Sequence, residues 1–126
     1  MSARSAHGER LAVRIESREK NGIVILDLQG KLMGGPDAEI FKTTFHKLLE
    51  QGRKKVVVNL HGVDWINSTG MGILISGYTT MRRGGGDLRL LHVSDKIRSI
   101  LYVTKLNLIF KCFESEDEAT ASFLDG

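Results

Sequence analysis

Three consecutive polar side chains, Asn67, Ser68 and Thr69, stand where they could take part in chemistry. They follow an apolar run and come directly before a segment with helical spacing. A hydroxyl or amide at such a junction can accept from the free N–H groups of the first helical turn. The positive end of a helix dipole also favours a phosphate. From the pattern alone, a helix cap is the favoured role of Ser68, and an accessible phosphate site is the second.

The residues after the hydroxyls predict a tight turn and a half-buried helix. Gly70 and Gly72 keep the turn narrow, so another surface can approach the backbone. The apolar residues that follow recur at close to the i, i+3, i+4, i+7 spacing of a buried helical face; they are Met71, Leu74, Ile75, Tyr78 and Met81. Three glycines at 84–86 predict the end of this helix.

A catalytic role for Ser68 is a further hypothesis, as the nucleophile of a small serine hydrolase. The nucleophile elbow of α/β-hydrolases requires Gly-x-Ser-x-Gly. Ile66 occupies the position of the first glycine, so the motif is incomplete. The four histidines show no metal-ligand spacing, and Cys112 has no second cysteine beside it. We therefore predict no catalytic residue, no metal site and no cofactor.

The elements that must position these residues follow from turn and periodicity signals. Asn21-Gly22 predicts a β-hairpin, and Pro36 followed by Asp37 predicts a helix start. Strands are expected near 11–16, 23–28, 56–60, 88–93 and 106–113, and helices near 36–51, 68–83, 94–104 and 115–123. The order β-β-α-β-α-β-α-β-α predicts an α/β fold with a mixed, mostly parallel sheet. The order of the strands within the sheet does not follow from the pattern.

Length and composition limit the remaining possibilities. The 126 residues fit one domain, with residues 1–10 expected as a flexible tail and 11–126 as the domain. No apolar run approaches the roughly 20 residues that cross a membrane, so no membrane insertion is expected. One cysteine favours a reducing cytoplasm. The basic clusters at 53–55 and 82–83 lack a nucleic-acid-binding module and are interpreted as solvated turns.

The run from Asn67 to Gly72 resembles the Asp-Ser-Ser/Thr-Gly-Leu/Met-Gly signature of the STAS domain family. Within that family the chain is most similar to bacterial anti-sigma factor antagonists, over about residues 11–124 by element order. Asn67 stands where most phosphorylated members have Asp. The resemblance implies a regulatory protein, not an enzyme, whose phosphorylated residue is Ser68, with Thr69 as second choice.

The resemblance also implies partners and a contact surface. The unmodified protein would bind an anti-sigma factor that is also a serine kinase, and a PP2C-type phosphatase would reverse the phosphorylation. The expected contact residues come from the signature and the preceding loop: Asn67, Ser68, Thr69, Gly70, Met71, Gly72, Gly30, Lys31, Leu32 and Met33. A monomer or weak dimer is expected. The alternative is a STAS subunit of a lipid-transport or stress-signalling complex that is never phosphorylated, and Asn67 favours it.

Overall fold

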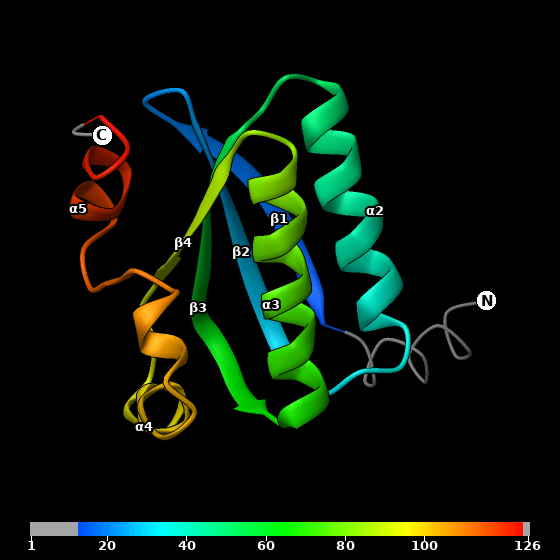
Figure 1. Ribbon diagram of the computed structural model, residues 1–126, viewed down its shortest axis with the longest axis vertical. Coiled ribbons are helices and arrows are strands. Elements are labelled where there is room, and N and C mark those ends of the chain that lie inside the picture. Colours follow the sequence, from blue (N-terminus) through cyan, green and yellow to red (C-terminus); the bar gives the residue numbers. More distant parts are fainter. Residues whose placement is uncertain (1–12, 125–126) are drawn as a thin grey trace.

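The computed structural model describes residues 13–124 as an α/β fold, as the element order predicted (Figure 1). The expected tail at 1–10 and the first residues of the expected first strand lie outside this range. None of the helices in the described part is long and apolar enough to cross a membrane. The elements are β1 Arg14–Lys20, β2 Ile23–Leu32, α2 Asp37–Glu50, β3 Lys55–Ile66, α3 Ser68–Arg83, β4 Asp87–Leu91, α4 Asp95–Val103, the 3₁₀ turn η1 Leu106–Leu108, β5 Cys112–Phe113 and α5 Glu116–Ala121.

The five strands form one sheet in the order β1-β2-β3-β4-β5. β1 pairs antiparallel with β2 through the predicted hairpin, in which Asn21 and Gly22 both have positive φ. That combination is typical of a type I′ turn. The other neighbouring strands are parallel. Their carboxyl ends therefore meet at one edge of the sheet, the lower edge in Figure 1, where α3 also begins.

The helices divide unequally between the two faces of the sheet. α2 and α3 cover one face, and α5 covers part of the other (Figure 1). The two long helices approach closely at Gly77, where an added Cβ would lie 2.6 Å from the Phe45 ring. The smaller core under α5 is apolar and consists of Ile23, Ile25, Val57, Leu91, Ala119 and Phe123. The larger core lies between the sheet and the helices α2 and α3. It fixes α3, and with it the position of Ser68.

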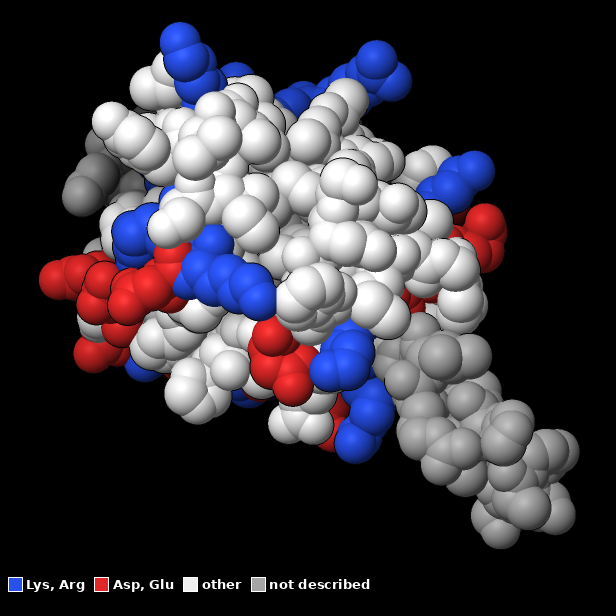
Figure 2. Space-filling model, turned by 90° about the horizontal axis from the view of Figure 1, so that it is seen from below, with Lys and Arg blue, Asp and Glu red and all other residues white. Residues whose placement is uncertain are grey.

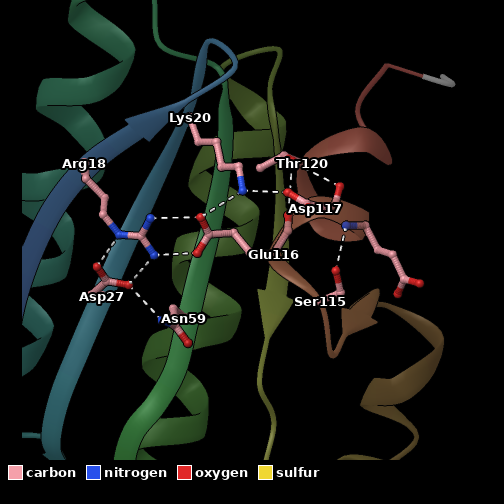
Figure 3. Close-up of polar contacts among 9 residues, drawn as sticks. Arg18, Lys20, Asp27, Asn59, Ser115, Glu116, Asp117 and Thr120 are labelled. Atoms are coloured by element: carbon pink, nitrogen blue, oxygen red, sulfur yellow. Dashed lines mark hydrogen bonds and ion pairs between the residues drawn. The ribbon is translucent and has the colours of Figure 1, made fainter.

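A network of charged side chains joins α5 to the hairpin (Figure 3). The Arg18 guanidinium lies 2.6 Å from Asp27 Oδ2 and 2.6 Å from Glu116 Oε1. Lys20 Nζ lies 2.6 Å from Asp117 Oδ1. Hydrogen bonds from Arg18 hold the pKa of both Asp27 and Glu116 below the usual carboxyl range. We call these five residues the hairpin–α5 corner.

Most strands differ from the predictions in extent; β1 ends at Lys20 and β2 at Leu32, each four residues beyond the predicted end. The expected strand over 106–113 was wrong for most of its length, because Lys105 turns the chain with a φ of 64° and a 3₁₀ turn follows. Only Cys112–Phe113 pairs with β4. β3 instead runs past the predicted end at residue 60 and continues to Ile66. The junction with α3 is therefore a direct passage from a long strand into a helix.

Candidate functional site

The junction between β3 and α3 lies at the edge of the sheet where the parallel strands end. Figure 2 views the molecule from this side and shows a broad area without charged side chains, with Lys, Arg, Asp and Glu along its margins. Asn67, Ser68, Thr69 and Gly72 belong to this end of the molecule, together with the loop at 33–35. We call this set the Ser68 face.

Asn67, and not Ser68, is the N-cap of α3, which corrects the role first favoured for Ser68. The Asn67 backbone is extended, and its Oδ1 accepts from Gly70 N–H at 2.8 Å. Its Nδ2 donates to the Met33 carbonyl oxygen at 3.3 Å. A single amide therefore caps the helix and ties the β2–α2 loop to it. Asn and Ser cap helices about equally well, so the sequence left the choice open.

The Ser68 hydroxyl is exposed at the first residue of α3. The side-chain hydrogen bonds at this junction belong to Asn67, and none within residues 13–124 involves the Ser68 hydroxyl. Thr69 is also exposed, but its methyl group packs against the backbone of Gly34, where an added Cβ would lie 2.7 Å from Cγ2. Of the two hydroxyl side chains, that of Thr69 is therefore the more restricted.

The two glycines of the signature have opposite surroundings. A Cβ on Gly70 would lie 1.9 Å from the Leu32 carbonyl oxygen, so the helix start packs directly on the end of β2. A Cβ on Gly72 would meet nothing within 4 Å. Gly70 is thus needed for packing within the protein, whereas Gly72 leaves open space beside Ser68.

Asp37 supports the site from beneath, a role that the sequence did not reveal. Its side chain is fully buried, and Oδ1 accepts from Val13 N–H at 2.8 Å. Oδ2 accepts from Met33 N–H at 3.3 Å. The carboxylate therefore fixes the same loop that Asn67 holds from the other side. An acidic residue in a first helical turn usually suits the helix dipole at the surface, so nothing in the pattern indicated burial.

The remaining expected contact residues divide by exposure. Gly30 and Lys31 are exposed at the end of β2, and Lys31 Nζ lies 3.6 Å from Asp64 Oδ1. Met33 is half-buried. Leu32 and Met71 are buried in the core, so their side chains hold the Ser68 face in place from below.

Trp65 adds an aromatic surface near the end of β3. Its side chain remains 40% exposed, and Lys96 Nζ lies 4.2 Å from the ring centroid. This cation–π contact links α4 to β3 next to the Ser68 junction.

The geometry presents a hydroxyl without the groups that would activate it for catalysis. Nucleophilic catalysis requires a base within hydrogen-bond reach, itself oriented by a third group. No hydrogen bond within residues 13–124 joins Ser68 to a histidine or a carboxylate. In the same range, no group of three His, Cys, Asp or Glu side chains could hold a metal ion. An accessible hydroxyl at a helix N-terminus is instead suited to accept a phosphate.

The sequence profile of the STAS domain matches residues 14–119. The chain belongs to the STAS domain family. The match spans every strand of the sheet and includes the β3–α3 junction. The predicted family is thereby confirmed.

Two relatives of this STAS domain carry related names. A Thermotoga maritima protein named "Putative anti-sigma factor antagonist" is 26% identical over 76% of this chain and 86% of its own length. A Bordetella bronchiseptica protein, "Putative anti-sigma factor antagonist BtrV", is 25% identical over 82% of this chain and 88% of its own.

Solved structures are similar in fold. The crystal structure of the Thermotoga maritima antagonist superposes with a TM-score of 0.77 at 25% identity, covering 86% of this chain and 92% of that one. The phosphorylated form of SpoIIAA from Bacillus superposes with a TM-score of 0.67 at 18% identity, covering 87% and 99%. At that identity the second likeness establishes the fold alone.

Proposed function

We propose that this STAS domain is an anti-sigma factor antagonist that is switched by phosphorylation of Ser68. The names of its relatives support the class of function. The observation that carries the proposal is the exposed Ser68 hydroxyl, which forms no side-chain hydrogen bond within residues 13–124 and lies at the start of α3.

The proposed cycle has three components besides the STAS domain. The unmodified domain binds an anti-sigma factor that is also a serine kinase, and the sigma factor is released. The kinase then transfers a phosphate to Ser68, which breaks the complex. A PP2C-type phosphatase removes the phosphate and restores binding.

The physical basis of the switch is the contrast between the fold and the contact surface. A phosphate adds about −1.5 to −2 charges at neutral pH. α3 tolerates that charge, because its first turn carries no acidic residue and its dipole favours an anion. A partner surface that fits the uncharged Ser68 face would have to desolvate the phosphate, which costs several kcal/mol unless the charge is paired, so the complex dissociates.

Asn67 affects the rate of this switch more than the fold. An aspartate at this position would still accept from Gly70 N–H, but would lose the donor that bonds the Met33 carbonyl. We expect Asn67→Asp to leave partner binding largely intact. Phosphorylation should become faster, because a carboxylate next to Ser68 can accept the hydroxyl proton during transfer. Single-turnover phosphorylation by the partner kinase measures this directly.

Copurification with substituted proteins tests the proposal. Ser68→Asp should lose the kinase, and Ser68→Ala should retain it persistently. Gly72→Leu should also lose the kinase while remaining folded by circular dichroism, because the space at Gly72 is open. Equal retention of all three variants would place the contact surface elsewhere.

The second candidate is a STAS subunit of a larger complex that is never phosphorylated, which Asn67 favours. In that case the copurified partner would lack a kinase, and Ser68→Asp would change binding little. A serine hydrolase remains the least supported alternative. Labelling of Ser68 by an activity-based serine probe would be needed to support it.

A further inference from the structure

A second surface feature lies at the opposite ends of the parallel strands from Ser68. It is a hollow of about 520 Å³ between the starts of β3 and β4 and the end of α5. In Figure 1 these starts lie at the upper end of the sheet, while α3 begins at the lower end. We call it the basic hollow; its lining residues are Lys54, Lys55, Gly85, Gly86, Asp87, Arg89, Lys111, Ser122 and Phe123.

The charges around the basic hollow are strongly unbalanced. Four lining residues are cations, namely Lys54, Lys55, Arg89 and Lys111, and the single acidic residue is Asp87. Their formal sum equals the net charge of the whole chain, +3. The formal charge of this one region is thus as large as the net charge of the whole protein. A concave surface of one sign concentrates ligands of the opposite sign.

The one carboxylate does not neutralise the lysines. Asp87 Oδ2 pairs with the Arg89 guanidinium and also lies 3.4 Å from Arg82 Nη1. Lys54, Lys55 and Lys111 form no ion pair within residues 13–124, in contrast to Lys20 in the hairpin–α5 corner. Three ammonium groups are therefore available to a ligand.

Arg89 is the most firmly held cation of the basic hollow. Its side chain is 7% exposed, and Nε donates to Ser122 Oγ at 2.9 Å. Its Cζ lies 4.2 Å from the Phe123 ring centroid. The guanidinium is thus held by the two residues that follow α5 and by Asp87 of its own strand.

We propose that the basic hollow binds a small anion that carries at least two linked phosphate groups, such as pyrophosphate or the phosphate chain of a nucleotide. Several ammonium groups around one concavity suit a compact polyanion. The only aromatic lining residue, Phe123, is 8% exposed and covered by Arg89, so a base has no ring on which to stack. Binding therefore depends on the phosphates and not on the base, and it is independent of the partner proposed at Ser68.

Calorimetric titration of the full chain at low salt tests this proposal, with pyrophosphate, ATP and AMP as probes. Pyrophosphate and ATP should bind with affinities within about threefold of each other, AMP should bind at least about tenfold more weakly, and added salt should weaken all three. The double variant Lys54→Ala/Lys111→Ala should lose about tenfold in affinity for pyrophosphate. The matched control is Lys42→Ala/Lys47→Ala on α2, which removes the same charge outside the basic hollow and should bind pyrophosphate as the wild type does.

Amide chemical shifts locate the ligand. Pyrophosphate should move the signals of Gly85, Gly86 and Lys111 and leave those of Ser68 and Thr69 unchanged. Absence of saturable binding would overturn the proposal, as would equal losses in the two double variants. ATP binding much more tightly than pyrophosphate would also overturn it, since recognition of the base would then dominate.

Discussion

The hairpin–α5 corner and the Ser68 face use polar groups in opposite ways. In the corner, five charged side chains pair with one another, and Arg18 and Lys20 each contact two carboxylates. On the Ser68 face, uncharged groups hold the structure, chiefly the Asn67 amide and close backbone packing at Gly70. The corner leaves few of its charges unpaired, whereas the Ser68 face leaves a hydroxyl without a side-chain partner within residues 13–124.

The function proposed for the Ser68 face rests on this difference. Paired charges at a partly exposed corner join two elements but contribute little energy each. An uncharged contact surface is sensitive to an added phosphate, because a partner that fits its uncharged form would have to desolvate the new charge. Substitutions in the two regions should therefore change the stability by different amounts, and these changes should depend differently on pH and phosphorylation.

The largest effect should come from Gly70→Ala. The new Cβ would collide with the Leu32 carbonyl, which is backbone and cannot easily move. We expect a loss of about 1–3 kcal/mol in the free energy of unfolding, or more, by analogy with overpacked cores. Gly72→Ala is the matched control, with open space around it, and should be neutral or stabilise by about 0.5–1 kcal/mol through helix propensity. Urea denaturation of both variants measures this, and equal losses would show that the packing argument is wrong.

A smaller effect should separate Asn67 from Ser68. Asn67→Ala removes the cap and the bond to Met33, and should cost about 1 kcal/mol or somewhat more. Ser68→Ala should cost less than about 0.5 kcal/mol, since it removes an exposed hydroxyl without a cap role. The same denaturation experiment compares them. A larger loss of stability in Ser68→Ala than in Asn67→Ala would indicate that Ser68, and not Asn67, caps α3.

A small effect that depends on pH should come from Arg18→Met in the hairpin–α5 corner. The pKa values of Asp27 and Glu116 are lowered in the folded state, so their pairing stabilises the protein above the unfolded carboxyl range of about pH 4. That stabilisation is lost as the pH falls through the lowered values. At neutral pH we expect the variant to be less stable by up to about 1 kcal/mol, because the side chains are partly exposed.

Unfolding curves of the wild type and Arg18→Met across acidic pH measure the predicted convergence. Arg14→Met, which removes an exposed arginine of the same strand, is the control and should show no such pH dependence. A stability difference for Arg18→Met that stays constant from neutral to strongly acidic pH would contradict the assigned pairing.

The sequence predicted those parts of the fold that depend on local signals. The Asn21-Gly22 hairpin and the starts of the helices expected at 94–104 and 115–123 follow from residue types and spacing. All are observed, with Ser94 and Ser115 as the helix N-caps. The strand order could not be predicted, since it depends on contacts between distant segments. The strand expected over 106–113 was too long, because the apolar residues at 106–110 suit a short strand and a 3₁₀ turn equally well.

The site was predictable in its position and less so in its internal roles. The junction of strand, hydroxyl and glycine located Ser68 correctly at the start of α3. The cap assignment failed because three residues that can cap a helix, Asn67, Ser68 and Thr69, follow one another where α3 begins. Asp37 was missed as a buried support because its burial results from contacts with Val13 and Met33 that only the tertiary structure brings together.

The central claim is that Ser68 is the switch, and phosphorylation by the copurified partner kinase tests it most directly. The kinase, ATP and the wild-type protein are incubated together, followed by intact mass measurement and peptide mapping, with Ser68→Ala as the control. One phosphate should be added to Ser68 and the complex should dissociate, whereas neither event should occur in the variant. Phosphate on Thr69 alone would move the switch by one residue. A kinase that binds the wild-type protein but adds no phosphate would contradict the account.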